Sequence, residues 1–570
     1  MRPRRGSALL VATVMVLQAC EPGPAPSGSA ASSAVATPAA SPGAAASAPA
    51  CGVTPSIPGA PWRDRVFYEI FVRSFADSDG DGIGDLAGAT ARLDYLNDGD
   101  PNTTQDLGVT GIWLMPVAEA VSYHGYDVTD YAAVEPDYGD RAAMQAFVEA
   151  AHARGILVIV DFVINHTSRD HPWFRDALDG GAHRDWYIWS PDDPGWPSVA
   201  GPNPWHRTAA GDYYYGAFWE GMPDLNLGNP EVTEELVNVA RTWLDEIGVD
   251  GFRIDAAKHL IETGRDSQIN TRETKAWLAR FRDAIDTTHP DALVLGEVYD
   301  GRAVTTSYIA DGALDMVFDF GIGPALTTGV YGDVSTVQAS QREIAERYAA
   351  GAAGTFLSNH DQPRVMTALR GDVDAAREAA AVLLTGPGVP FLYYGEELGM
   401  TGTKPDEQIR TPFPWTAEAP GHGFTEGVPW EPFTAEAPTA NVAVQDADPG
   451  SLLAAYRWLV QLRGAHEALA AGSWARVEAS SRTVAASVRA AGAERLLLLH
   501  NLSREPASAV SLDLDAGPLC GTPGAELLHA TNGSPGAPAA PIISAAGGLS
   551  DYVPLPELPA RSTVVIDISG

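Results

Sequence analysis

The sequence predicts an α/β protein built on a (β/α)8 TIM barrel, with a small domain inserted after the third strand and an antiparallel β-sandwich domain at the C-terminal end. From Arg65 onward, short apolar and β-branched runs alternate with Ala-rich amphipathic stretches, a pattern typical of βα units around a parallel sheet. Eight such runs occur before Leu469, and eight strands close this kind of barrel. The predicted strands are Val66–Phe75, Gly111–Val117, Ile156–Asn165, Gly251–Ala256, Leu293–Tyr299, Leu314–Phe320, Thr355–Asn359 and Val389–Tyr394.

Two segments interrupt the alternation and predict further domains. Residues 167–229 are rich in Trp, Tyr, Pro, Gly and Asp, show no helical period, and are too long for an ordinary βα loop. After the helix-like run Leu452–Leu469, short strand-like runs are separated by turns. We therefore predict a barrel of residues 57–166 and 230–469, an inserted domain of residues 167–229, and a C-terminal β domain of residues 470–570.

The N-terminal residues predict export. Three early arginines precede a mostly apolar run from Ala8 to Leu17, which is too short to span a bilayer and is typical of a signal peptide. The ending Leu-Gln-Ala-Cys20 resembles a bacterial lipobox, which predicts a signal peptide of residues 1–19 and a lipid on Cys20. The alternative is a plain cleaved signal with an incidental cysteine. In both cases we expect an extracytoplasmic protein, either secreted or held at the cell envelope through its lipid anchor alone.

Residues 20–56 are almost entirely Ala, Pro, Ser, Gly and Thr. Such a composition buries too little apolar surface to offset its ordering entropy, so we predict a disordered linker. Apart from Cys20, the chain has Cys51 and Cys520. In an oxidising compartment this pair predicts a disulfide as one outcome, but their spacing leaves two free thiols equally open.

The charge balance limits the partners. The chain has 37 Lys and Arg against 73 Asp and Glu, which gives a formal net charge of -36. This charge repels phosphate backbones, so we expect no nucleic-acid partner. The negative charge would not hinder binding of a neutral substrate. We also expect the protein to be a monomer.

Acidic side chains occur repeatedly where the predicted strands end. In a parallel barrel these ends meet on one rim. A single Asp after a strand is more often a helix cap, but four acidic residues accompanied by His166, Arg253 and His360 indicate a catalytic site. The four are Asp161, Asp255, Glu297 and Asp361.

Seven short motifs follow one another along the chain. Four are DFVINH (161–166), GFRIDAAKH (251–259), GEVY (296–299) and FLSNHD (356–361), and three supporting ones are GIWLMP (111–116), MPDLN (222–226) and GVPFLYYGEE (388–397). In order and spacing they resemble the motifs of the α-amylase family of glycoside hydrolases, from about Pro61 to Leu469. The resemblance implies hydrolysis of α-glucans such as starch and maltodextrins.

The resemblance also implies the catalytic roles. Glycosidic cleavage with retention needs an acid on the leaving oxygen and a nucleophile about 5 Å away. By motif position Asp255 is the expected nucleophile, Glu297 the acid and base, and Asp361 the carboxylate that stabilises the positively charged sugar ring. Arg253 lies two residues before Asp255 on the same strand face, where it favours the ionised nucleophile. Glu297 must be protonated at rest, which requires a raised pKa.

Three further residues are expected to hold the glucose unit. Tyr126, in the motif HGYD, is similar to a family residue that stacks on the sugar, although a packed surface aromatic is the alternative. His166 and His360 are similar to residues that hydrogen-bond the sugar hydroxyls. These side chains suit a ligand with apolar ring faces and polar edges.

A calcium loop is expected in the run DSDGDGIGD, which begins at Asp77. Oxygen ligands alternate, and a Gly occupies the sixth position. The run departs from an EF-hand because Gly88 stands where the bidentate Glu should be, and it resembles a truncated loop found in part of the family. A solvated Asp/Gly turn is the alternative. The expected ligands are Asp77, Asp79, Asp81, the carbonyl of Ile83, and Asp85.

A second calcium ion is implied by the resemblance alone. Asn165, Asp224 and the carbonyl oxygen of His259 match family ligands between the barrel and the inserted domain. The sequence does not identify the remaining ligand.

The mode of attack is less defined. Lys258 followed by His259 resembles true α-amylases and favours endo-hydrolysis, whereas Asp127 and Arg410 resemble residues that clamp a terminal glucose in α-glucosidases. This mixture resembles an intermediate bacterial subgroup that contains lipoprotein α-amylases. We expect an endo-acting α-amylase, with an exo-acting α-glucosidase or transglycosylase as the alternative. A non-catalytic relative would have lost acidic residues, and none is lost.

Overall fold

A computed structural model describes residues 61–201 and 203–570. The predicted signal peptide, the lipidation site Cys20, the linker and Cys51 lie outside the described residues. In the part of the chain that is described, no helix is long and apolar enough to cross a membrane.

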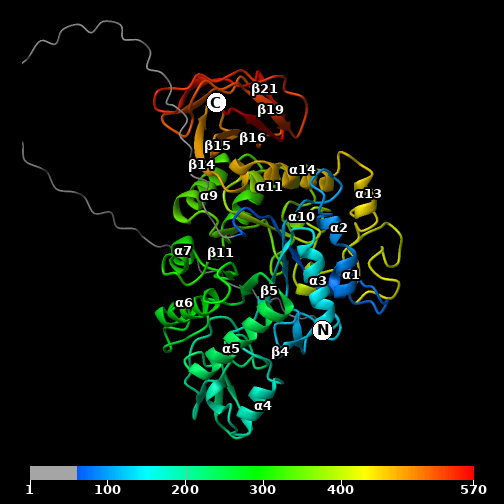
Figure 1. Ribbon diagram of the computed structural model, residues 1–570, viewed down its shortest axis with the longest axis vertical. Coiled ribbons are helices and arrows are strands. Elements are labelled where there is room, and N and C mark those ends of the chain that lie inside the picture. Colours follow the sequence, from blue (N-terminus) through cyan, green and yellow to red (C-terminus); the bar gives the residue numbers. More distant parts are fainter. Residues whose placement is uncertain (1–60, 202) are drawn as a thin grey trace, which may run out of the picture. The chain divides into compact units, whose positions relative to one another are not determined.

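The main body is a closed barrel of parallel strands, which confirms the predicted fold class (Figure 1). Around the barrel the strand order is β1-β13-β12-β11-β10-β9-β5-β2. The strands are β1 (Phe67–Ile70), β2 (Gly111–Leu114), β5 (Leu157–Phe162), β9 (Gly251–Ile254), β10 (Leu293–Gly296), β11 (Met316–Phe318), β12 (Ala353–Thr355) and β13 (Val389–Tyr393).

The seventh barrel strand lies earlier than the sequence predicted. Its pairing with β13 ends at Thr355, which is opposite Pro390. Phe356 and Leu357 are buried, which explains why the sequence pattern resembles a strand there, but they already belong to the loop. The earlier end of β12 places residues 356–359 in the same loop as His360.

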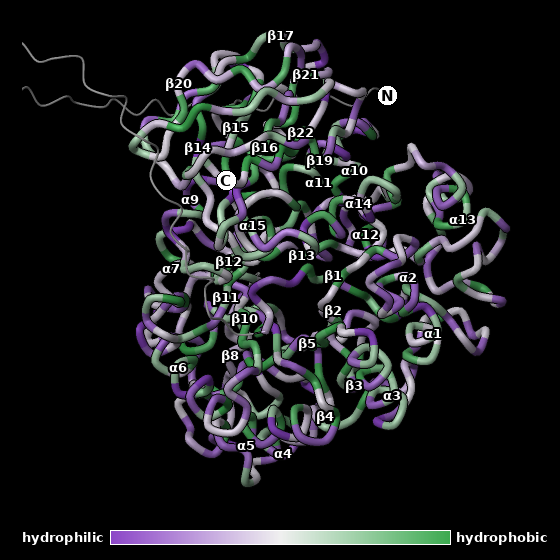
Figure 2. Tube along the Cα trace, turned by 45° about the horizontal axis from the view of Figure 1, so that its top comes forward, coloured by the Kyte–Doolittle hydropathy of each residue, from purple (hydrophilic) through white to green (hydrophobic). Residues whose placement is uncertain are grey.

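The barrel interior is filled by large apolar side chains from alternate positions of the strands. Phe67, Trp113, Phe318 and Phe391 belong to this cluster, and the rings of Phe67 and Phe391 stack at 4.6 Å. Such packing makes the barrel a solid core with its chemistry at the rim. Figure 2 shows the mostly hydrophobic character of strands such as β5, β10 and β11.

Helices surround the barrel, and their starts follow local sequence signals. The helix α5 has Asn229 as its N-cap and Pro230 at its first position, and α6 begins after Thr271, whose hydroxyl accepts from the Thr274 amide. The helices are α1 (Leu86–Ala91), α2 (Leu93–Leu96), α3 (Arg141–His152), α5 (Pro230–Thr242), α6 (Arg272–Asp286), α7 (Arg302–Ala310), α8 (Ile322–Gly329), α9 (Val334–Arg347), α10 (Val365–Ala368), α11 (Val373–Thr385), α12 (Asp406–Ile409), α13 (Val442–Asp446), α14 (Leu452–Ala465) and α15 (Glu467–Ala470).

Two excursions leave the strand ends near the rim. The first is the antiparallel pair β3 (Ala118–Ala120) and β4 (Val128–Val134), whose connecting loop carries Tyr126. The second follows β5 and contains α4 (Pro172–Leu178) and a small sheet with the order β6-β8-β7. Its strands are β6 (Trp189–Ser190), β7 (Trp205–Arg207) and β8 (Tyr213–Tyr215), and they lie within the segment predicted as an inserted domain.

After α15 the chain forms an antiparallel sheet with the order β19-β22-β16-β15-β14-β18-β20, and a separate pair β17-β21. The buried Arg489 of β15 donates hydrogen bonds to the Thr385 and Gly386 carbonyls at the end of α11. Cys520 is buried here and disulfide-bonded, but Cys51 is not described, so their pairing stays a prediction. The strands are β14 (Ser473–Ala479), β15 (Val484–Ala491), β16 (Glu494–Asn501), β17 (Ala507–Ser508), β18 (Leu512–Leu514), β19 (Glu526–Ala530), β20 (Leu549–Tyr552), β21 (Glu557–Leu558) and β22 (Ser562–Asp567).

Candidate active site

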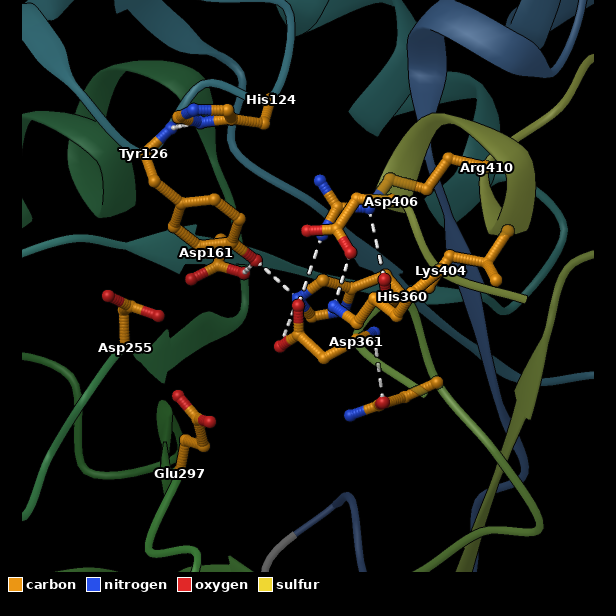
Figure 3. Close-up of polar contacts among 12 residues, drawn as sticks. His124, Tyr126, Asp161, Asp255, Glu297, His360, Asp361, Lys404, Asp406 and Arg410 are labelled. Carbon is orange, nitrogen blue, oxygen red and sulfur yellow. Dashed lines mark hydrogen bonds and ion pairs between the residues drawn. The ribbon is translucent and has the colours of Figure 1, made fainter. Parts of the chain in front are cut away.

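A pocket of about 400 Å³ opens at the carboxyl ends of the barrel strands. Most of the residues predicted to be catalytic or to bind substrate line it. Figure 3 shows Asp255 and Glu297 on one side, and Asp361 with His360 and Arg410 on the other. The lining residues with polar or aromatic side chains are His124, Tyr126, His166, Phe218, Asp255, Lys258, His259, Glu297, Tyr299, Asp361, Asp406 and Arg410.

One guanidinium group organises the first side of the pocket. Arg253 is 1% exposed and lies on β9, next to β5 and β10 in the barrel. Its Nη1 donates to Asp161 Oδ1 at 2.8 Å and to Asp255 Oδ1 at 2.7 Å, and its Nη2 donates to Glu297 Oε2 at 2.7 Å. The planar fork of an Arg suits this several-way contact. It brings the predicted nucleophile and the predicted acid against the same cation.

The pKa values of the two carboxyl groups predicted to be catalytic are under opposing influences. Burial raises the pKa of Asp255, while Arg253 lowers it and the charge of Asp361 raises it. Burial likewise raises the pKa of Glu297, with the same opposition from Arg253 and with Asp255 and Asp361 as further raising charges. Both pKa values therefore lie above their usual range. A raised pKa fits the proton that Glu297 is expected to carry at rest. The Arg253 cation favours the ionised form of Asp255.

The opposite side of the pocket has a different charge balance. Asp361 Oδ2 lies 3.1 Å from His360 Nε2, and its Oδ1 accepts from Arg410 Nη2 at 3.1 Å. Desolvation in the pocket would raise the pKa of Asp361, but His360 and Arg410 hold it well below its usual range. Burial would lower the pKa of His360, but Asp361 and Glu69 raise it to about 10. At neutral pH this side of the site therefore contains the Asp361 anion in contact with two cations, His360 and Arg410.

The predicted sugar-binding residues meet between these two sides. Tyr126 donates its hydroxyl proton to Asp161 Oδ2 at 3.1 Å, and its hydroxyl oxygen lies 2.7 Å from His360 Nε2. His166 Nε2 contacts the Tyr126 carbonyl at 3.0 Å, and burial lowers the pKa of His166 to about 4, so this imidazole is neutral. The structure thus brings Tyr126, His166 and His360 together around the catalytic carboxylates.

Asp127 and Arg410, the residues that resemble a clamp for a terminal glucose, have different partners in the structure. Asp127 accepts hydrogen bonds from the Ser122 amide at 3.0 Å and the Ser122 hydroxyl at 2.6 Å. Arg410 instead pairs with Asp361 and with Asp406 at 3.3 Å, and its Nε donates to the His360 carbonyl at 3.0 Å. Asp406 and Arg410 are four positions apart, so the turn of α12 places this carboxylate beside the guanidinium.

Lys258 and Tyr299 lie at the edge of the pocket beyond Glu297. Lys258 Nζ donates to the Tyr299 carbonyl at 2.7 Å and lies 5.9 Å from the Tyr299 ring. The Tyr299 residue is 63% exposed. A large exposed aromatic next to a Lys offers a platform for a further sugar unit.

Sequence reasoning missed two acidic residues at this site. Glu69 belongs to the apolar run of β1, where a single acidic residue gives no motif signal, yet its Oε1 lies 2.5 Å from His360 Nδ1. Asp406 had one available signal, since it stands four residues before Arg410. For Glu69 only the position of the His360 loop reveals the contact.

The predicted calcium loop gathers part of its expected ligands. Carboxylate oxygens of Asp77, Asp79 and Asp85 lie within 4.8 Å of one another, whereas Asp81 is not in this group and accepts from the Ile83 amide at 2.8 Å. Clustered hard oxygen ligands fit Ca²⁺. Gly88 is explained by packing, because a Cβ there would lie 2.3 Å from the Ala76 carbonyl oxygen. A Glu at this position has no room, so the loop differs from an EF-hand for a steric reason.

The second predicted metal site is partly assembled. Asn165 Nδ2 donates to Asp224 Oδ2 at 3.0 Å, and both residues are buried. Among the described residues, the buried Asn165 Oδ1 has no hydrogen-bond partner. An unsatisfied oxygen beside a buried carboxylate fits a cation. The His259 side chain lines the pocket nearby.

A barrel whose rim carries these carboxylates, with the side chains predicted to bind sugar beside them, is the arrangement expected of a glycoside hydrolase. The family profile described as "Alpha amylase, catalytic domain" matches residues 69–472. Alpha-amylase 3 of Dictyoglomus thermophilum is 38% identical over 454 residues, covering 78% of this chain and 86% of that protein. The oligo-1,6-glucosidase of Parageobacillus thermoglucosidasius is 30% identical over 523 residues, covering 78% and 91%. The crystal structure of an alpha-amylase from H. orenii has a TM-score of 0.76 at 38% identity and covers 89% of this chain and 99% of that one. The chain therefore belongs to the α-amylase family, glycoside hydrolase family 13.

Proposed function

We propose that this protein is a retaining, endo-acting α-amylase that hydrolyses α-1,4-glucosidic bonds in starch and maltooligosaccharides by double displacement. The observation that carries the chemistry is the contact of Asp255 and Glu297 with the same Arg253 guanidinium, opposite Asp361. Two neighbouring carboxyl groups with a charged third one across the pocket suit an oxocarbenium-like transition state.

In the first half of the reaction, Glu297 gives its proton to the glycosidic oxygen while an Asp255 oxygen attacks the anomeric carbon. The bond to the leaving chain breaks, and a glycosyl ester to Asp255 forms. Arg253 stabilises the carboxylate that remains on Glu297. Asp361, kept ionised by His360 and Arg410, faces the positive charge that develops on the ring.

In the second half, the Glu297 carboxylate takes a proton from a water molecule, and the resulting hydroxide attacks the anomeric carbon. The ester bond to Asp255 breaks, and the electron pair returns to that carboxylate. The two displacements together restore the original anomeric configuration. Tyr126, His166 and His360 hold the sugar during both steps.

Two contacts favour endo-hydrolysis. Arg410 is engaged by Asp361, Asp406 and the His360 carbonyl, so it does not form with Asp127 the clamp expected for a terminal glucose. On the leaving-group side, Lys258 and the exposed Tyr299 ring continue the pocket outward. A cleft of this kind accepts a chain on both sides of the scissile bond.

Calcium is part of the proposal. Asp77, Asp79 and Asp85 would hold one ion, and Asn165 and Asp224 would contribute to a second. The ion at the first site would supply charge neutralisation and a structural cross-link. The Asp77 loop is already tied to the segment around Thr425, whose hydroxyl donates to Asp77 Oδ2 at 2.5 Å.

We also propose that the protein is exported and that a lipid on Cys20 anchors it to the cell envelope. The support is the lipobox-like Leu-Gln-Ala-Cys20 after a signal-like run. Mass spectrometry of the membrane fraction would find a diacylglyceryl-modified Cys20 peptide. A soluble, unmodified enzyme from the wild-type gene would exclude the anchor.

The alternative is an exo-acting α-glucosidase or transglycosylase. It is favoured by the presence of both Asp127 and Arg410 and by the similarity to an oligo-1,6-glucosidase. Reducing-end-labelled maltoheptaose separates the two. Early labelled products of intermediate length support the endo-amylase. Labelled products that shorten by one glucose at a time, or that are longer than the substrate, would contradict it.

A further inference from the structure

Glu69 is a carboxylate buried inside the barrel directly beneath the catalytic pocket. It is 1% exposed and lies on β1 two residues after Phe67, whose side chain belongs to the barrel interior. Since alternate residues of a strand share a face, the Glu69 side chain also points inward. An ionisable group in such a place is unfavourable unless it has a charged or hydrogen-bonding partner.

Its partner is His360, which is 0% exposed. Glu69 Oε1 lies 2.5 Å from His360 Nδ1. On the other edge of the ring, Nε2 lies 3.1 Å from Asp361 Oδ2 and 2.7 Å from the Tyr126 hydroxyl. A neutral imidazole donates from one nitrogen only, whereas the imidazolium donates from both. The carboxylates at both edges of the ring therefore favour the protonated, cationic form of His360.

The state of His360 determines the direction of the Tyr126 hydroxyl. When His360 Nε2 donates to this oxygen, the hydroxyl proton is directed to Asp161 Oδ2, 3.1 Å away. Asp161 in turn accepts from Arg253, which contacts both catalytic carboxyl groups. Glu69 is thus the first member of a hydrogen-bonded chain that continues through His360 and Tyr126 to Asp161 and Arg253.

We propose that Glu69 is a positioning residue that holds His360 as a doubly donating imidazolium and, through it, keeps Asp361 ionised and the Tyr126 ring in place. Glu69 does not line the pocket, so it acts through His360. No bond to substrate is made or broken by it. The inference deepens the proposed function, on which its kinetic test depends.

The charged groups around His360 come from several elements. Glu69 lies on β1, Asp161 on β5, and Asp255 directly after β9, while Asp361 and the Tyr126 hydroxyl contact the ring. Both Asp161 and Asp255 are influenced by the charge of His360. The opposing cations are Arg253 and Arg410, the latter donating to the His360 carbonyl.

The kinetic test uses Glu69→Gln, which keeps the size and an acceptor oxygen but removes the charge. A contacting opposite charge shifts a pKa by about 1–3 units, so the pKa of His360 should fall by this amount. The substrate is α-maltosyl fluoride, because its leaving group needs no proton from Glu297. The alkaline limb of kcat/KM should move to lower pH by about 1–3 units, giving a loss of tenfold or more on that limb.

Glu397→Gln is the matched control. Glu397 is 0% exposed and accepts hydroxyl protons from Tyr68, the neighbour of Glu69 on β1, and from Tyr95. It does not contact His360 or line the pocket. This variant should lose stability but keep the wild-type alkaline limb. An identical limb in Glu69→Gln, Glu397→Gln and the wild type would overturn the proposal.

A second measurement does not depend on catalytic activity. In spectra of the protein labelled with 15N-histidine, the His360 signals are identified by their loss in His360→Asn. In the wild type both ring nitrogens should stay protonated beyond about pH 8, since Glu69 and Asp361 raise the pKa of His360 to about 10. A neutral His360 at that pH would overturn the proposal. In Glu69→Gln the same titration should show a lower pKa for His360, and an unchanged His360 titration would overturn the proposal. If the wild type cleaves no α-glucan, the proposed function fails while this comparison still decides the role of Glu69.

Discussion

On one wall of the pocket, three carboxyl groups share a single guanidinium, whereas on the other wall one carboxylate, Asp361, contacts two cations, which also pair with Glu69 and Asp406. Arg253 is shared by Asp161, Asp255 and Glu297, and the pKa values of all three are raised, chiefly by burial. Asp361 lies between His360 and Arg410, and its pKa is strongly lowered. The difference teaches that the number of cations in contact with a carboxyl group, more than the residue type, decides whether its pKa is raised or lowered.

The largest effect is expected from Asp255→Asn, which removes the nucleophile from the carboxylate-rich wall. The amide cannot form the glycosyl ester, so kcat should fall by about 10⁴-fold or more. Binding of maltooligosaccharides, measured by calorimetry, should persist. The exposed Asp266→Asn is the control. Retention of more than a few percent of activity would remove Asp255 from its role.

Glu297→Gln tests the acid on the same wall and should lower kcat on starch by about 10²–10⁴-fold. Glu297 works as an acid while protonated, and its raised pKa extends that state to higher pH. Wild-type activity is therefore lost as pH rises through this pKa. For substrates with aryl leaving groups that need no acid, the variant should lack this alkaline limb. If Glu297→Gln keeps the alkaline limb of the wild type, that limb belongs to another group.

Arg410→Ala tests the opposite wall, and a smaller effect is expected. Removing one of the two cations should raise the pKa of Asp361 by about 1–3 units, while His360 still opposes protonation. Because Asp361 is needed as an anion, activity should be lost at a higher pH as the solution is acidified. The largely exposed Arg272→Ala, whose side chain is 92% exposed, is the control. Coincident acid limbs in these two variants would contradict the role given to Arg410.

The smallest effect is expected at the calcium loop, which lies outside the pocket. Chelation should lower Tm by a few °C, because a bound ion stabilises only the folded state. In calorimetric titration with Ca²⁺, Asp79→Asn should weaken binding more than Asp81→Asn, since Asp79 belongs to the carboxylate cluster and Asp81 does not. Equal losses would place Asp81 among the ligands.

The difference between Asp255 and Glu69 shows how far the sequence reaches. Asp255 is found from the motif GFRIDAAKH because strand ends and motif spacing are local, and the closed barrel brings them to one rim. Glu69 and His360 are 291 positions apart. The residues next to Glu69 and next to His360 in the sequence give no signal of this contact. Likewise, the apolar Phe356 and Leu357 resemble a strand in sequence, and only the ladder shows that β12 ends at Thr355.

By itself, the sequence determined the barrel, the C-terminal β domain, the α-amylase family and the order of its acidic motifs, because periodicity and spacing are properties of the chain. Only the tertiary structure decided which charges meet: Glu69 with His360, Arg410 with Asp361 and Asp406 and not with Asp127, and Asp81 apart from the acidic cluster. The physical reason is that a pKa or an ion pair depends on distances of a few Å and on burial, which arise when distant segments pack together.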